Sequence, residues 1–248
     1  MKKPIIISFA SQGRENYNKA MLYLISSCQD IWDGDYMLWS LDGYIDQYKD
    51  VSIILGNGKY PNSTMGQCYN HAEVPYQFKP HLFQKAFDEG YRQVIWCDST
   101  IRMLKHPKPL LEIAKKQGVV TFHNLGHPLS HWISDAALNQ LGVNPKDRNT
   151  INTLEQIMAC VIIFDFDNPN GLEIFNEWMK HAQDGVSFQN GYGSSRPEFI
   201  SHRHDQAVLS YIVQKAGIPM QPYGQLCYPP HHETKEFGKD IYFLNKGL

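Results

Sequence analysis

The chain has 248 residues, of which 42% are hydrophobic, 12% aromatic and 19% charged, a composition that excludes a disordered chain. This length suffices for one α/β domain, 1–248, with a full core. A formal net charge of -2 at pH 7 excludes a global basic field of the kind that binds nucleic acid or anionic lipid without specificity.

Cysteine spacing and apolar runs narrow the class of protein further. The five cysteines are widely spaced and contain no C-x-x-C pair, so neither a disulfide framework nor a zinc knuckle is predicted. The longest apolar runs, such as 159–164, fall far short of the roughly 20 residues that a membrane-spanning helix needs. Residues 11–15 end the first apolar stretch too early for a signal peptide, so a cytoplasmic location is the default expectation.

Short β-rich runs alternate with helical patterns from the first residues, which predicts βα units on a mostly parallel sheet. Residues 5–10 form a predicted buried strand, and the apolar spacing over 21–28 predicts a helix. The next predicted strands are 36–39 and 51–55. Pro80 fits a helix start and Gly90 its C-terminal cap, and the strand 92–97 follows at once.

The second half of the chain continues the alternation. A helical pattern at 110–116 precedes a predicted strand at 119–122, and another strand is predicted at 159–164. Asn168 and Pro169 open a helix. Residues 185–199 form a long Gly- and Ser-rich loop of the kind that often covers a site. The last helix begins near His204 and ends at Gly217, and the tail from 219 onward wraps over the fold.

Ligands of open α/β sheets bind at the carboxyl ends of the strands. Asp98 is the sharpest candidate there, because a carboxylate that ends an apolar strand suits the divalent cation that a diphosphate leaving group needs. An aspartate after a strand is equally often a turn residue or a helix cap. The same rule selects Ser8, Phe9, Ala10 and Arg14 after the first strand, Ser99 and Thr100 beside Asp98, and Asp165 after the strand 159–164.

Two further segments carry candidate functional groups. Lys79 precedes the predicted helix start, where an ammonium and exposed backbone amides could approach a phosphate, although a lone surface lysine is usually a solvated charge. Residues 202–206 place five polar side chains at the opening of the last helix. Asp205 alone is explained by the helix dipole, but five such side chains exceed what a cap requires.

The histidines support a weaker metal hypothesis. His123, His127 and His131 recur every fourth residue, which on a helix would align three metal ligands, but Gly126 and Pro128 argue for a loop instead. The pair at 231–232 could bring an imidazole to the site, although a surface pair is the commoner explanation. No Gly-x-Ser-x-Gly, Walker A or Gly-x-Gly-x-x-Gly pattern is present, which disfavours hydrolases, ATPases and dinucleotide-binding enzymes.

Four blocks, taken in order, resemble nucleotide-sugar glycosyltransferases of the GT-A superfamily: 78–80 with its helix, 94–101, 155–178 and 202–210. The resemblance implies an α/β fold of GT-A type, with a Rossmann-like, mostly parallel central sheet flanked by helices and a long loop and C-terminal tail covering the site. It also implies a nucleotide-sugar donor such as a UDP-sugar, Mn or Mg as cofactor, and transfer of a hexosyl or pentosyl group to an acceptor hydroxyl.

The resemblance assigns roles to individual residues. Asp98 corresponds to the first acidic residue of the family's Asp-x-Asp metal motif, but Thr100 stands at the second acidic position, so an ion would be held by Asp98, the diphosphate, water and His232. Lys79 and Arg203 would stabilise the departing diphosphate, and Asp205 would be the base if the reaction inverts. The predicted donor-binding residues are Ser8, Phe9, Ala10, Arg14, Lys79, Ser99, Thr100, His204 and Gln206.

Two alternatives stay open at this point. A non-catalytic nucleotide- or glycan-binding module of the same fold is motivated by Thr100, and a metal-dependent hydrolase is motivated by the abundant histidines. No motif identifies the acceptor, so a glycan, a protein side chain, a small molecule and a modified nucleic-acid base all remain candidates.

Overall fold

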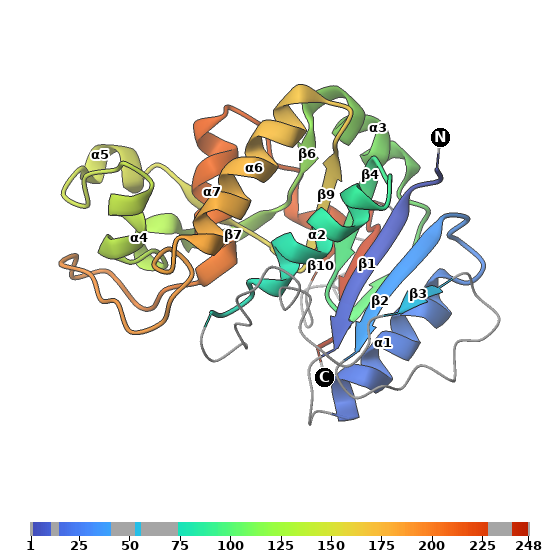
Figure 1. The fold of residues 1–248 in the computed structure, drawn as a ribbon. Helices are drawn as coiled ribbons and strands as arrows, with labels where there is room; N and C mark the ends of the chain where they lie inside the picture. Colours follow the sequence, from blue (N-terminus) through green and yellow to red (C-terminus); the bar gives the residue numbers. More distant parts are fainter. Residues whose placement is uncertain (1, 11–14, 41–52, 56–73, 228–239, 248) are drawn as a thin grey trace.

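The computed structural model describes residues 2–10, 15–40, 53–55, 74–227 and 240–247. A six-stranded sheet in the order β3-β2-β1-β4-β9-β6 forms its centre (Figure 1). Apolar runs account for these strands, and β1, β6 and β9 are buried along their whole length. The strands are β1 (Ile5–Ala10), β2 (Asp35–Ser40), β3 (Ile53–Leu55), β4 (Gln93–Cys97), β6 (Val119–Val120) and β9 (Val161–Asp165).

The sheet is mostly parallel, as the alternating pattern predicts. β1 pairs in parallel with β2 and β4, and β2 with β3, whereas β9 runs antiparallel to both β4 and β6. The reversal of β9 corrects one expectation: Asp165 pairs with Gln93 at the start of β4, at the edge opposite Asp98. Its carboxylate accepts hydrogen bonds from Gln93 Nε2 at 2.9 Å and from the Asp167 amide at 3.0 Å, so Asp165 is a turn residue.

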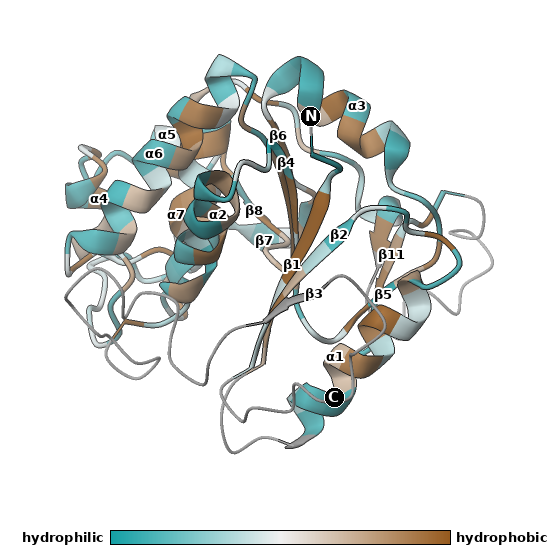
Figure 2. Ribbon diagram, turned by 45° about the vertical axis from the view of Figure 1, so that its right-hand side comes forward, coloured by the Kyte–Doolittle hydropathy of each residue, from teal (hydrophilic) through white to brown (hydrophobic). Residues whose placement is uncertain are grey.

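Helices cover both faces of the sheet (Figure 2). Buried apolar side chains of the strands and helices form two core layers, one on each face. Along β1, Ile5 and Ile7 point into one layer and Ile6 into the other, as the two-residue period of a strand requires. The first layer lies beneath α2 (Phe78–Asp88), α6 (Pro169–Gln183) and α7 (His204–Lys215), and the second beneath α1 (Glu15–Cys28) and α3 (Lys108–Gln117).

Smaller elements flank the central sheet. The remaining elements are β5 (Ile101–Met103), β7 (His123–Pro128), η3 (Leu129–His131), α4 (Asp135–Gln140), α5 (Arg148–Ile151), β8 (Glu155–Ile157), η4 (Tyr223–Gln225), β10 (Leu226–Cys227) and β11 (Phe243–Asn245). β11 pairs with β5, so the C-terminal segment returns beside the residues that follow Asp98. His123 and His127 lie on a strand instead of the expected loop, and His123 Nδ1 lies 3.0 Å from Glu155 Oε2.

Helix ends follow local chemistry. The Asn168 side chain caps α6 by accepting a hydrogen bond from the Asn170 amide, with Pro169 in the first turn, as predicted. Gly118 ends α3 with φ 95° and packs so closely on the start of α6 that a Cβ there would lie 2.2 Å from Gly171 N. Only glycine fits such a position without strain. None of the helices in the described ranges is long and apolar enough to cross a bilayer.

Candidate functional site

A pocket of about 360 Å³ opens where β4 ends and α7 begins, which is a volume typical of small-molecule sites. It therefore lies at a carboxyl end of the parallel strands, as expected for this class of sheet. The residues that line it are Tyr76, Asp98, Cys160, Asn190, Ser201, His202, Arg203, His204, Asp205 and Gln206.

Lys79 lies beneath this pocket, in the first turn of α2, because the helix begins at Phe78 and not at Pro80. Its side chain is only 4% exposed, which corrects the expectation of a lysine standing free before the helix. The ammonium donates a hydrogen bond to the Ala159 carbonyl at 2.9 Å. It also forms ion pairs with Asp205 Oδ2 at 3.1 Å and Asp98 Oδ1 at 3.5 Å.

The charge of Lys79 is stabilised by these carboxylates. Burial by itself lowers the pKa of the ammonium, but Asp205 and Asp98 outweigh that effect and raise the pKa above its ordinary value. An ammonium has three N–H bonds, and three protein oxygens surround this one. The ammonium is thus already paired inside the protein, and a direct contact between Lys79 and a donor phosphate stays a prediction.

Asp98 is both a turn residue and a pocket residue. Its amide donates to the Cys160 carbonyl at 2.8 Å and its carbonyl accepts from the Ile101 amide at 2.9 Å, which fixes the turn after β4. Its Oδ1 accepts a hydrogen bond from Trp96 Nε1 at 2.7 Å. The side chain is 37% exposed, so the carboxylate faces the pocket with its position fixed from below.

Asp205 is the enclosed carboxylate of the site. Its side chain is 3% exposed, and burial raises the pKa of the carboxyl group to about 6, even though Lys79 opposes this shift. Trp178 Nε1 donates to the Asp205 carbonyl at 3.2 Å and fixes the start of α7. Asp205 Oδ2 lies 3.1 Å from Lys79 Nζ and has no other polar partner within the described part of the chain. It is ionised at neutral pH and can accept a proton.

The described residues do not fit a divalent metal ion. They contain no group of three His, Cys, Asp or Glu side chains arranged to hold one. Asp98 is the accessible carboxylate, Thr100 at the second motif position is buried, and Asp205 is paired with Lys79. His232, the other predicted ligand, lies outside the described residues.

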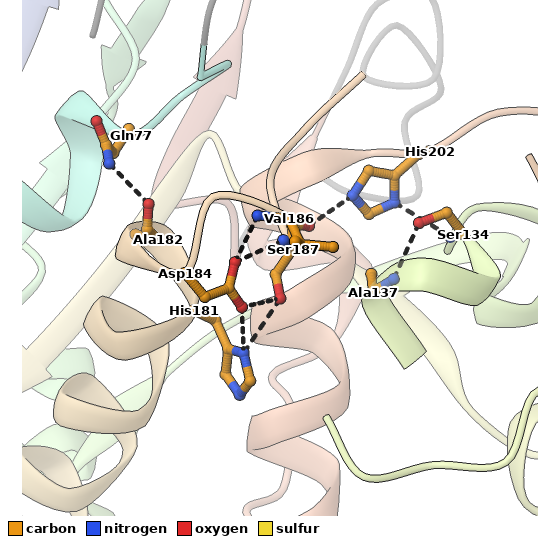
Figure 3. A network of polar contacts seen from close by, with 9 residues as sticks. All are labelled: Gln77, Ser134, Ala137, His181, Ala182, Asp184, Val186, Ser187 and His202. Atoms are coloured by element: carbon orange, nitrogen blue, oxygen red, sulfur yellow. Dashed lines mark hydrogen bonds and ion pairs between the residues drawn. The ribbon is translucent and has the colours of Figure 1, made fainter. Parts of the chain in front are cut away.

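His202 is a structural crosslink between three segments (Figure 3). Its Nε2 donates to the Ser187 carbonyl at 2.8 Å, and its Nδ1 accepts from the Ser134 amide at 3.3 Å. This pair of contacts requires the neutral imidazole, because a protonated Nδ1 could not accept. Burial also lowers the pKa of His202. Its neighbour His204 makes a similar contact, with Nδ1 3.0 Å from the Phe188 carbonyl.

The segment between α6 and α7 begins at a polar anchor (Figure 3). Asp184 Oδ1 accepts from the Val186 and Ser187 amides at 2.8 and 2.7 Å. His181 Nδ1 lies 3.1 Å from both Asp184 Oδ2 and Ser187 Oγ. This brings a serine, a histidine and an aspartate together, but the serine and the aspartate both contact the same ring nitrogen. Ser187 is also fully buried, so the arrangement is structural and is not a catalytic triad. The cluster anchors the start of the predicted loop 185–199, and Asn190 of that loop lines the pocket.

Arg203 and Gln206 complete the predicted cluster at the start of α7. The Arg203 guanidinium is exposed and lies 4.8 Å from the centre of the Trp132 ring, a cation–π distance. Gln206 Nε2 donates to Gln156 Oε1 at 2.8 Å and to the Ile157 carbonyl at 2.9 Å. Arg203 is thus a pocket cation that solvent reaches, while Gln206 joins α7 to β8.

Other predicted donor-binding residues lie deeper. Ser8 and Ala10 are fully buried in β1, and Phe9 stacks on Phe78 with ring centres 4.1 Å apart. Ser99 and Thr100 are also buried. Arg14 lies outside the described residues, as do residues 228–239 of the tail. Contacts between these residues and a donor remain predictions.

Tyr76 lines the pocket without having been marked by any sequence pattern. Its φ is 60° and that of His204 is 44°, both in the left-handed region that non-glycine residues rarely adopt. The two rings lie 5.6 Å apart, and the Tyr76 ring lies 5.1 Å from Lys79 Nζ. Strain of this kind concentrates at binding sites. Neither backbone conformation follows from residue type, so the sequence could not reveal it.

Comparisons with known proteins agree with the fold. No family model and no curated protein matches the chain. Among solved structures, the WbbM bifunctional glycosyltransferase in its apo form matches with a TM-score of 0.58 and 14% identity over 100% of this chain and 46% of that chain. The chain thus spans about half of WbbM.

Mouse xyloside xylosyltransferase 1 in its apo form matches with a TM-score of 0.55 and 10% identity, over 100% of this chain and 98% of that chain. Identities this low establish the fold alone. The predicted α/β fold with a mostly parallel central sheet flanked by helices is confirmed, and the chain shares this architecture with these two glycosyltransferases.

Proposed function

We propose that this protein is a glycosyltransferase that moves a sugar from a nucleoside-diphosphate donor to an acceptor hydroxyl in the pocket beside Asp98 and Asp205. The observation that carries the proposal is the position of Asp205, a pocket carboxylate whose Oδ2 is paired with Lys79 alone among the described residues, at the strand ends of a fold shared with two glycosyltransferases. Ligands of such sheets bind at this edge.

In the proposed reaction, Asp205 and Arg203 have separate parts. As the acceptor oxygen forms its bond to the anomeric carbon, Asp205 takes the hydroxyl proton and the bond to the diphosphate breaks, with its electrons leaving on the diphosphate. Since the pKa of Asp205 is about 6, the carboxylate is ionised and competent at neutral pH. This course inverts the anomeric centre. Arg203, the exposed cation of the pocket, is the group placed to stabilise the diphosphate.

The proposed donor and cofactor rest on the sequence resemblance, whereas the proposed reaction rests on the pocket. A UDP-sugar rests on the resemblance of the four sequence blocks. Both hexosyl and pentosyl donors belong in a screen, the latter because one structural relative is named a xylosyltransferase. Mn or Mg, proposed from the same resemblance, is a variable of that screen, because the described side chains do not fit an ion.

A donor screen tests the proposal. Release of nucleoside diphosphate and of sugar is measured for a panel of nucleotide sugars, with Mn, with Mg and with chelator, for the parent and for Asp205→Asn. We expect at least one donor to be turned over by the parent and much more slowly by the variant. Absence of binding and turnover for every donor contradicts the proposal.

A binding module of the same fold is the second candidate, favoured by Thr100 at the second motif position and by the absence of a three-ligand cluster in the described part of the chain. Calorimetry distinguishes it, because a module binds nucleotide or glycan without releasing sugar. The hydrolase alternative has no metal site among the described histidines.

A further inference from the structure

We infer that Lys79 is a positioning residue whose ammonium occupies the cation position between Asp98 and Asp205, so that the pocket holds its two carboxylates without a divalent ion. The inference deepens the proposed function and rests on it for the meaning of the site. Its structural basis is that side chains from three separate segments meet at one nitrogen atom: α2, the turn after β4, and α7.

The oxygens around Lys79 Nζ are of the kind that a hard cation prefers, two carboxylates and a backbone carbonyl. Their distances to the nitrogen are 2.9 Å for Ala159 O, 3.1 Å for Asp205 Oδ2 and 3.5 Å for Asp98 Oδ1. Hydrogen bonds from nitrogen span about 2.7–3.2 Å, whereas Mg and Ca bind oxygen at about 2.0–2.6 Å. The Ala159 and Asp205 oxygens therefore lie at hydrogen-bonding distance from the ammonium and Asp98 Oδ1 lies at ion-pair distance, and all three distances exceed those of bonds to Mg or Ca.

The remaining capacity of Asp98 is also limited. Its Oδ1 accepts a hydrogen bond from Trp96 Nε1 at 2.7 Å and lies 3.5 Å from the Lys79 ammonium, so that oxygen already faces a donor and a positive charge of the protein. The residue two positions on, Thr100, brings no second carboxylate. A divalent ion placed here would meet a buried positive charge at short range, and the two cations would repel each other.

One consequence concerns catalysis. If Lys79 supplies the fixed positive charge between the two carboxylates, sugar transfer needs no added metal ion to hold them in place. Arg203 is then the group that contacts the diphosphate.

A second consequence is a latent metal site. Removing the charge of Lys79 leaves two carboxylates and a carbonyl facing one vacated position, which is the oxygen set of a divalent-cation site.

Mn binding to the full chain tests the inference without any donor. Electron paramagnetic resonance titrations of free Mn are made with the parent, Asp98→Asn, Lys79→Met, and the double variant Lys79→Met with Asp98→Asn. Methionine keeps an unbranched chain but removes the charge. We expect the parent and Asp98→Asn to bind Mn with equal affinity. Lys79→Met should gain a Mn site that is at least about tenfold tighter than any Mn binding by the parent, because a neighbouring unit charge has been removed. The double variant should lose it.

Thermal unfolding provides a second readout. Mn should raise the Tm of Lys79→Met and leave that of the parent unchanged, an effect that a merely structural lysine would not produce. Mn binding by the parent that is lost in Asp98→Asn overturns the inference, and this comparison decides it even if Lys79→Met does not fold. A folded Lys79→Met that gains no Mn site overturns it as well.

Failure of the proposed function is distinguishable from these outcomes. The Mn titrations use neither donor nor turnover, so a chain without transferase activity can still pass them. If the chain is active and its turnover persists in chelator, the inference is supported. The inference is overturned if chelator abolishes the activity and Mn restores it in the parent but not in Asp98→Asn.

Discussion

Asp205→Asn separates the chemistry of the pocket from its architecture. Asparagine keeps the shape of the side chain but cannot serve as the base, and loss of a positioned general base costs about 10²- to 10⁴-fold in rate. Breaking a buried ion pair costs about 3–5 kcal/mol when the remaining charge is uncompensated. Lys79 retains Asp98 and the Ala159 carbonyl, so we expect a smaller loss of about 1–2 kcal/mol in the free energy of unfolding.

The assay is diphosphate release as a function of pH, together with urea unfolding. Burial raises the pKa of Asp205 to about 6 against the pull of Lys79, with Asp98 and Tyr76 as the other ionisable neighbours. Because the ionised form is the base, kcat/KM of the parent should rise as pH increases through about 6 and then level off. The variant should lose this rising limb together with its rate.

Asp165→Asn is the matched control. Asp165 is as buried as Asp205, but it lies at the opposite edge of the sheet, where it accepts from Gln93 and the Asp167 amide. We expect a stability loss with kcat/KM and its pH profile unchanged. An Asp205→Asn protein that keeps the parental rate and the same pH dependence would refute the role of Asp205 as base.

Three further predictions concern binding and stability. Arg203→Ala should weaken UDP binding about tenfold or more, with a small change in Tm, since the lost contact is to a charged group and the side chain is exposed; unchanged calorimetric affinity would exclude Arg203 from the donor site. Gly118→Ala should destabilise the fold by more than about 2 kcal/mol, and Gly126→Ala should destabilise it by less. Both glycines have positive φ, but only at Gly118 would the added Cβ clash with a backbone atom, Gly171 N. Equal losses of unfolding free energy in urea would contradict this packing argument. His202 is held neutral and burial lowers its pKa, so the unfolded chain takes up the proton first. The free energy of unfolding should therefore fall as the pH drops below about 6.5. His202→Gln should flatten this dependence on pH, and an unchanged dependence would assign the acid sensitivity to other groups.

The layered fold was predictable because its signals are local. Apolar runs of strand length alternate with helical spacing, and Asn168, Pro169 and Gly217 mark helix ends through backbone chemistry that acts within a few residues. The direction of β9 was not predictable in the same way. A buried strand has the same apolar composition whether it runs parallel or antiparallel, so the sequence placed Asp165 at the wrong edge of the sheet.

The site was predictable as a set of residues but not as a set of roles. Asp98 and Asp205 were identified from their positions after a strand and at a helix start, and both line the pocket. The role of Lys79 depends on contacts with residues far along the chain, such as Ala159, 80 positions away. Tertiary packing decides whether a lysine is solvated or enclosed. The same holds for His202, which is fixed in the neutral form by the Ser134 amide and the Ser187 carbonyl.

A crystal structure of the chain with bound UDP is the most direct test of the claim that donor chemistry takes place beside Asp98 and Asp205. The account predicts the diphosphate inside this pocket, within hydrogen-bonding distance of Arg203, with Lys79 still bonded to the two carboxylates and the Ala159 carbonyl. A nucleotide bound at another face of the molecule, or a diphosphate bonded directly to Lys79 Nζ, would contradict it.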